Sequence, residues 1–240
     1  VMEMQCRQRD GIAWMRANPD AWSKDSFFQV HLWWHLALYH LELGEIDEVL
    51  ALFDGPIHGA RSPLALDMID ASALLWRLHL RGIDVGGRWQ TVADGWMPFA
   101  SAGNYVFNDV HAVMAFVGAG RQKAVDAVLA AQQAAMAGAD DNAAFTREVG
   151  HPVTLALLAF GRGDYRETVS RLRAVREIAH RFGGSHAQRD VLDLTLIEAA
   201  LRSGQAALAT ALCAERLEIR PESPLSRQFV LRTQALRVAA

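Results

Sequence analysis

One sequence pattern recurs along this chain and constrains its fold more than any other feature. A long apolar segment with helical periodicity ends at a glycine, one to three polar residues follow, and an amphipathic segment begins. The glycines of these turns are Gly44, Gly120, Gly163 and Gly204. Glycine suits the position just past a helix because it adopts positive φ without strain. We therefore expect consecutive helices that turn back on one another as hairpins.

The spacing of these glycines indicates a structural repeat. Gly163 follows Gly120 by 43 residues and Gly204 follows Gly163 by 41, while the 76 residues from Gly44 to Gly120 are close to twice that distance. Tetratricopeptide repeats have a period of about 34 residues and other helical-hairpin arrays of about 40–47. The sequence predicts an all-α fold, namely a tetratricopeptide-like helical-hairpin solenoid with a right-handed superhelix. A compact, irregular helical bundle is the alternative.

Helical periodicity runs through almost the whole chain, and sustained strand-type alternation is absent. Between Tyr165 and Phe182, for example, apolar residues recur every three or four positions, and charged residues fall between them. The segments expected to be helical are 26–43, 46–53, 63–81, 88–99, 105–117, 122–137, 152–160, 164–182, 187–202, 206–219 and 223 to the end.

Composition argues against several function classes. The chain has 24 Lys and Arg residues against 27 Asp and Glu, a net charge of −3, so it lacks the basic field that attracts nucleic acid or anionic membrane. Its longest apolar runs, such as residues 153–160, are far shorter than the roughly 20 residues of a membrane span. Cys6 and Cys213 form no CxxC pair, which is typical of a reducing compartment. We expect a cytoplasmic protein with neither a nucleic-acid nor a membrane partner.

Three motifs together resemble one family. They are Asp25–Tyr39 (DSFFQVHLWWHLALY), Phe107–His111 (FNDVH) and Gly183–Val191 (GGSHAQRDV). Shorter matches are Asp67–Asp70, Trp76–Arg77 and Arg88–Trp89. Their order and spacing resemble those of the tetratricopeptide repeat protein 38 family along nearly the whole chain. His151, which precedes a proline where an apolar residue is expected, departs from the pattern.

The resemblance implies an all-helical superhelix in the cytosol, and it leaves the biochemical activity open. Chains of that family are roughly twice as long, so residues 1–240 correspond to their C-terminal half, as a single α-solenoid domain. Val1–Gln5 then represents the middle of a helix, since nothing before it supplies a cap. We expect the missing N-terminal half or a second copy of the chain to cover the exposed side of that first helix.

His31 and His35 form the first candidate site. They are four residues apart in an apolar, aromatic-rich segment, so both imidazoles lie on one face of a helix. Such a pair can bind a metal ion, but the glutamate of a zincin motif is missing, and a third ligand would have to be Asp109 or His111. Two imidazoles that hydrogen-bond to neighbouring helices in the solenoid interior are the simpler interpretation.

Asn108, Asp109 and His111 are expected in the first turn of a helix. There an Asn or Asp side chain can cap free N–H groups, and the positive helix end favours an anion. Capping explains Asn108 or Asp109, but it does not explain His111. A carboxylate beside an imidazole is the minimal general-base pair, above all if His35 converges there too.

A capping box opens the helix that follows Gly183–Gly184. Ser185 is its expected N-cap, with Gln188 three residues later. Arg189 and Asp190 remain in the first turn without a capping role. An arginine there is poorly placed for the helix dipole but well placed to hold a carboxylate from another helix or from a ligand.

Two function classes follow. As a binding module, the concave face of the solenoid would hold a small anionic molecule or a peptide. As an enzyme, the chain would perform hydrolysis or proton transfer on a small anionic metabolite, with His35, Asp109 and His111 as catalytic groups. Because the unusual polar residues gather in three motifs, we expect them to meet in one inner pocket. The residues expected to bind the ligand are His31, Trp34, Asn108, Gln188, Arg189 and Asp190. We expect no cofactor. The one alternative is a metal ion bound by His31 and His35.

Overall fold

The computed structural model describes residues 1–238, and within them the regular secondary structure is entirely helical. The prediction of an all-α protein is confirmed. The chain forms two compact units: unit 1 comprises residues 1–60 and the segment from residue 204 onward, and unit 2 comprises residues 61–203. The expectation of one solenoid domain over residues 1–240 stays a prediction. None of the helices in the described part of the chain is long and apolar enough to span a membrane.

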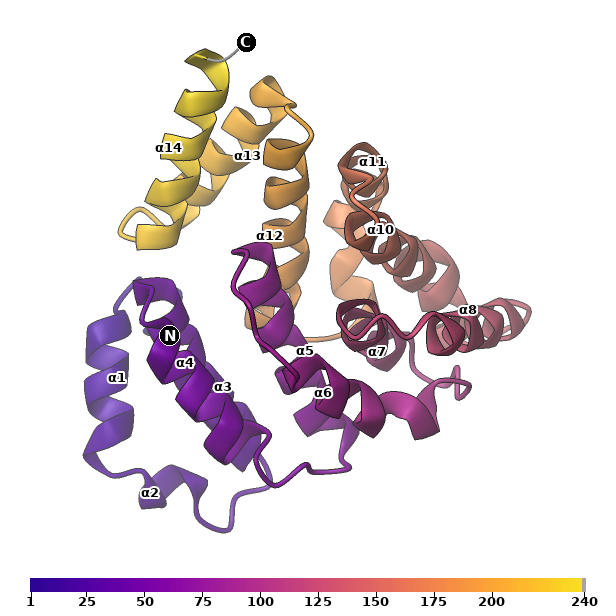
Figure 1. The fold of residues 1–240 in the computed structure, drawn as a ribbon, viewed down its shortest axis with the longest axis horizontal. Helices are drawn as coiled ribbons and strands as arrows, with labels where there is room; N and C mark the ends of the chain where they lie inside the picture. Colours follow the sequence, from indigo (N-terminus) through magenta and orange to yellow (C-terminus); the bar gives the residue numbers. More distant parts are fainter. Residues whose placement is uncertain (239–240) are drawn as a thin grey trace. The chain divides into compact units, whose positions relative to one another are not determined.

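Unit 1 is built around one buried helix, α3 (Figure 1). Its helices are α1 (Gln8–Ala17), α2 (Asp20–Ser23), α3 (Gln29–Leu43), α4 (Ile46–Leu52) with the π-helical turn η1 (Phe53–Ile57), α13 (Ala206–Ile219) and α14 (Pro224–Val238). Trp34, Leu36 and Ala37 of α3 are completely buried. The helices α1, α2, α4 and α14 pack against α3, and α13 packs against α14.

Unit 2 consists of helical hairpins whose helices close into a ring (Figure 1). Its helices are α5 (Ala65–Leu80), α6 (Arg88–Trp96), the 3-10 helix η2 (Met97–Phe99), α7 (Val106–Gly118), α8 (Gln122–Met136), α9 (Asp141–Phe145), the π-helical turn η3 (Thr146–Gly150), α10 (His151–Gly161), α11 (Tyr165–Val175), the 3-10 helix η4 (Arg176–Phe182) and α12 (His186–Arg202). The hairpin pairs are α5–α6, α7–α8 and α10–α11. Helix α7 packs against both α5 and α10, α11 packs against α12, and α12 returns to α5. The indole Nε1 of Trp76 donates to Thr195 Oγ1 at 3.0 Å and so ties α5 to α12.

The turns expected at glycines share one backbone geometry. Gly44, Gly120, Gly163 and Gly204 have φ values of 77°, 68°, 78° and 70°. The residue after each of them has φ between −89° and −80° and ψ between 66° and 72°. In the first three turns its N–H donates to the carbonyl oxygen five residues earlier, as in a Schellman motif. Glycine supplies the left-handed conformation that this motif requires, so the helix–glycine–helix pattern was a reliable predictor.

Other boundaries differ from the expectation. The helix expected over residues 164–182 changes from α to 3-10 geometry at Arg176, whose Nε donates to Asp193 of α12 at 2.7 Å. The expectation that Val1–Gln5 is the middle of a helix is wrong. Residues 2–6 form a turn, Cys6 has a left-handed φ of 56°, and α1 begins only at Gln8. The short helices α1, α2 and α9 were not among the predicted segments.

Candidate functional site

The imidazoles of His31 and His35 lie together on α3, as their spacing predicted. Their ring centroids are 4.7 Å apart, with the rings nearly perpendicular at 80°. His31 also stacks on the indole of Trp34, with centroids 5.2 Å apart and an angle of 18° between the rings. Trp34 is completely buried, so its indole packs against the His31 imidazole and is not accessible to a ligand.

A carboxylate from the first turn of the chain faces His35. Glu3 Oε2 lies 3.6 Å from His35 Nδ1, and Glu3 Oε1 lies 3.5 Å from Arg220 Nη1. The side chain of His35 is 28% exposed and that of Glu3 16%, so this pair is within reach of solvent. Sequence reasoning missed Glu3 and Arg220, because neither belongs to a motif and both are far from His35 along the chain.

Exposed aromatic side chains border the same part of α3. Phe28 is 53% exposed and Phe27 is 69% exposed, and the Phe28 ring lies 6.5 Å from the His31 ring. We call the group Phe28, His31, His35, Glu3 and Arg220 the histidine face. It combines flat apolar rings with a carboxylate and a guanidinium. Within residues 1–238, no three His, Cys, Asp or Glu side chains come together as ligands of a metal ion would.

In unit 2, Asp109 points from α7 toward α8. It is hydrogen-bonded to Gln132, whose Nε2 donates to Thr154 Oγ1 at 2.9 Å and whose Oε1 lies 3.0 Å from His151 Nδ1. Burial raises the pKa of Asp109 to about 6, and the hydrogen bond with Gln132 opposes that rise. Asp109 is therefore part of a buried polar network that joins α7, α8 and α10.

His111 leaves α7 in another direction. Its Nδ1 donates to the carbonyl oxygen of Phe107 at 2.8 Å, while its buried Nε2 has no hydrogen-bond partner. Burial lowers the pKa of His111 to about 4, the Phe107 carbonyl opposes this, and the charge of Arg77 adds to the lowering. Residues two apart on a helix project about 200° apart, so the structure does not bring Asp109 and His111 together as a general-base pair.

The N-terminus of α7 is capped from outside the helix. Asn142 of α9 accepts from the N–H of Val106 at 3.1 Å, and its Nδ2 donates to the carbonyl oxygen of Gly103 at 3.0 Å. Since α7 begins at Val106, Asn108 and Asp109 lie inside its first turn, and the expectation that one of them caps it is wrong. Asn108 itself is half-buried.

The predicted capping box at the start of α12 is confirmed. Ser185 Oγ accepts from the N–H of Gln188 at 3.3 Å, and Gln188 Oε1 accepts from the N–H of Ser185 at 2.9 Å. Arg189 folds back on the preceding turn, where its Nη1 donates to the carbonyl oxygens of Gly183 and Gly184. The guanidinium thus has a structural role that needs no ligand. Its neighbour Asp190 is half-buried and lies just past the first turn of α12, not within it as expected.

A second arginine, noted in the sequence only as part of the Trp76–Arg77 match and not as a site residue, reaches this turn from α5. Arg77 is 3% exposed, and its Nη2 donates to the carbonyl oxygen of Ala187 at 2.6 Å. A charged residue after Trp76, within the apolar run of residues 73–78, was the signal that could have identified it. Burial of such a side chain requires hydrogen-bonding partners, and the α12 backbone supplies one.

The candidate residues divide between the two units. His31, Trp34 and His35 belong to unit 1, and Asn108, Asp109, His111, Gln188, Arg189 and Asp190 belong to unit 2. Their convergence in one pocket stays a prediction. The chain matches no protein-family model, and no solved structure matches it significantly. Function must therefore be inferred from the side chains themselves.

Proposed function

We propose that this chain is a cytoplasmic, tetratricopeptide-like helical-repeat binding module that holds a peptide against the histidine face of unit 1. The observation that carries the proposal is the half-exposed imidazole pair of His31 and His35, 4.7 Å apart and bordered by the exposed ring of Phe28. Exposed aromatic groups of this kind are typical of sites that bind other chains.

The repeat architecture is part of the same proposal. A turn of one geometry at Gly44, Gly120 and Gly163 links a mostly buried helix to an amphipathic one each time. Recurrence of one helical hairpin is what a right-handed solenoid requires. The resemblance to the tetratricopeptide repeat protein 38 family supports the same architecture. Arrays of this kind commonly bind peptides or proteins.

Access to solvent favours the histidine face over the polar residues of unit 2. Asp109 is buried and engaged with Gln132, and Arg189 is engaged with backbone carbonyl oxygens. At the histidine face, by contrast, the imidazole rings can stack on a ligand. A peptide suits this face better than a small anion does, because the face offers aromatic rings for stacking and its guanidinium, Arg220, is already paired with Glu3.

The test begins with selection of a displayed random peptide library on the immobilised chain. Enriched peptides are then titrated by fluorescence anisotropy against wild type, Phe28→Ser and His31→Ala. We expect both variants to bind about tenfold more weakly, or worse, which corresponds to about 1.4 kcal/mol of binding energy. Arg173→Gln, on the exposed side of α11, is the matched control and should bind like wild type. Peptides that bind the two variants as tightly as wild type would refute the proposed site.

A second candidate function is catalysis at the same face. The Glu3 carboxylate lies beside His35 Nδ1, an arrangement in which the other ring nitrogen, Nε2, can act as a general base. Here Glu3 takes the place that Asp109 was expected to fill. If the chain hydrolyses small anionic substrates, turnover of p-nitrophenyl phosphate should disappear in both Glu3→Gln and His35→Gln. Turnover that survives in either variant would exclude this pair as the catalytic base.

A further inference from the structure

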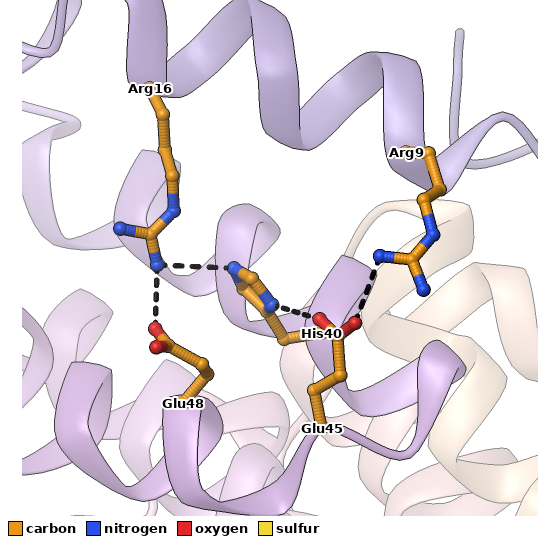
Figure 2. A network of polar contacts seen from close by, with 5 residues as sticks. All are labelled: Arg9, Arg16, His40, Glu45 and Glu48. Atoms are coloured by element: carbon orange, nitrogen blue, oxygen red, sulfur yellow. Dashed lines mark hydrogen bonds and ion pairs between the residues drawn. The ribbon is translucent and has the colours of Figure 1, made fainter.

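Five charged or ionisable side chains connect α1 to the α3–α4 hairpin (Figure 2). Arg16 Nη2 donates to Glu48 Oε2 at 2.7 Å and to His40 Nε2 at 3.2 Å. On the other side of the imidazole, His40 Nδ1 lies 2.6 Å from Glu45 Oε2, and Glu45 Oε1 accepts from Arg9 Nη1 at 3.0 Å. We call this group the His40 clasp. Figure 2 shows both arginines reaching from α1 to the residues of the hairpin.

Apart from these polar contacts, α1 is held in place by the burial of only a few side chains. Only Gln8, Gly11 and Met15 of its ten residues are buried, and Trp14 is 64% exposed. The close contact is at Gly11, where an added Cβ would lie 2.6 Å from the ring of Tyr39. Because hydrophobic stabilisation scales with the apolar area removed from water, the polar clasp supplements an attachment of α1 that buries few apolar side chains.

When His40 is neutral, the clasp accommodates one tautomer of its ring. A guanidinium only donates hydrogen bonds, so His40 Nε2 must accept from Arg16, and Nδ1 must carry the proton that is donated to Glu45. His40 is 4% exposed, and both of its nitrogens are engaged. A second proton, on Nε2, would replace the acceptor with a donor and bring two cations together. The bond between Arg16 and His40 cannot survive that change.

Four charged side chains surround the imidazole of His40. Arg16 of α1 and Glu45 of the turn face it directly, and Arg9 and Glu48 lie one contact further out. Helices α2 and α14 and the turn η1 also pack against α3, while the hydrogen bonds of His40 connect it to Arg16 and Glu45. The hydrogen bond with His40 holds the pKa of Glu45 below its usual range against the effect of burial, and Arg9 adds to this. Glu45 therefore keeps its charge at mildly acidic pH.

We propose that α1 is a releasable helix, held on the α3–α4 hairpin while His40 is neutral and loosened when His40 gains a second proton. Imidazole is the side chain that ordinarily changes charge between pH 8 and pH 5. The remaining contact of Arg16 with Glu48 is an exposed ion pair, and such pairs stabilise little. Tyr39 lies four residues after His35 on the same side of α3, so release of α1 lengthens the histidine face by one turn. That last consequence, unlike the clasp, rests on the proposed peptide site.

Hydrogen–deuterium exchange of the full chain tests the clasp without any ligand. Exchange of peptides covering residues 8–17 is measured at pH 7.5 and pH 5.5 and corrected for the intrinsic effect of pH. We expect the protection of α1 to fall about tenfold or more at pH 5.5, while α12 keeps its protection. Equal protection of α1 at both pH values would overturn the proposal.

Two variants separate the clasp from general acid sensitivity. In His40→Gln the amide can still accept from Arg16 and donate to Glu45, but it does not titrate, so α1 should stay protected at both pH values. In Arg16→Met, α1 should be poorly protected at both. The proposal is overturned if either variant retains the pH response of the wild type. The Arg16→Met result stands by itself if His40→Gln fails to fold.

Discussion

Replacement of Asp109 by asparagine should stabilise this protein at neutral pH. Asp109 is 6% exposed, and burial raises its pKa from 3.8 to about 6. In the unfolded chain the carboxyl group loses its proton at the lower pH, so between these values the folded state binds more protons than the unfolded state. The free energy of unfolding therefore falls as the pH rises from about 4 to about 6. Above that window the charged carboxylate weakens the fold.

The size of the effect follows from the pKa difference. Each pKa unit corresponds to about 1.4 kcal/mol, so the roughly two units at Asp109 correspond to about 3 kcal/mol at most. An asparagine carries no charge and can still accept from Gln132. Asp109→Asn should therefore raise the free energy of unfolding by about 2–3 kcal/mol at pH 7.5, and the melting temperature by roughly 4–12 °C. Near pH 4 the carboxyl group is protonated in the folded state and partly protonated in the unfolded chain, so most of the advantage should be lost.

Urea unfolding followed by circular dichroism at pH 7.5 and pH 4 measures this difference. Asp126→Asn, at an exposed position of α8, provides the matched control and should change stability by less than about 0.5 kcal/mol at both pH values. An Asp109→Asn variant that is less stable than wild type at pH 7.5 would refute the reasoning. So would a gain of equal size at pH 4, because that gain could not arise from removal of the charge.

Three further predictions concern His111, Gly118 and Ser185. Burial lowers the pKa of His111 from 6.5 to about 4, so the stability that neutral His111 contributes above pH 6.5 is lost as the pH falls toward 4. In urea titrations over that range, the free energy of unfolding of His111→Gln should depend less on pH than that of wild type. Gly118→Ala should destabilise unit 2 by about 1–3 kcal/mol in thermal melts, because its Cβ would lie 2.2 Å from the ring of Trp89, whereas Gly55→Ala has open space and should be close to neutral. Ser185→Ala should lower the free energy of unfolding by about 1 kcal/mol through loss of the capping box, and an unchanged urea midpoint would contradict that role.

Local signals in the sequence predicted local structure well. The turn at Gly163 requires a left-handed residue after a helix, and the cap of α12 requires Ser185 and Gln188 three residues apart. Each depends on a few neighbouring residues, so the pattern alone was sufficient. The spacing of His31 and His35 likewise placed both imidazoles on one face, because helical geometry determines it.

The partners of these residues were not predictable, because they come from distant parts of the chain. Arg77 bonds to a carbonyl oxygen 110 residues away, and the cap of α7 comes from Asn142 rather than from the residues beside it. No periodicity or motif predicts such contacts, because they depend on how whole helices pack against one another. Asp109 and His111, by contrast, lie inside the helix that was expected over residues 105–117, where helix geometry itself separates side chains two positions apart.

The return of α12 to α5 changes how unit 2 must fold. In an open array each hairpin contacts only its neighbours, so folding can nucleate anywhere and spread one repeat at a time. Here the bonds Trp76–Thr195 and Arg202–Leu80 join residues 119 and 122 positions apart. The buried polar groups of α5, the first helix of unit 2, therefore find their partners only after α12, the last helix, has been synthesised. Bringing α5 and α12 together closes a loop of more than 100 residues, and this closure costs chain entropy in one step. We therefore expect unit 2 to fold in a single transition that is slower and more cooperative than the stepwise assembly of an open array. A truncation at either end of unit 2 should then destabilise every hairpin of the ring.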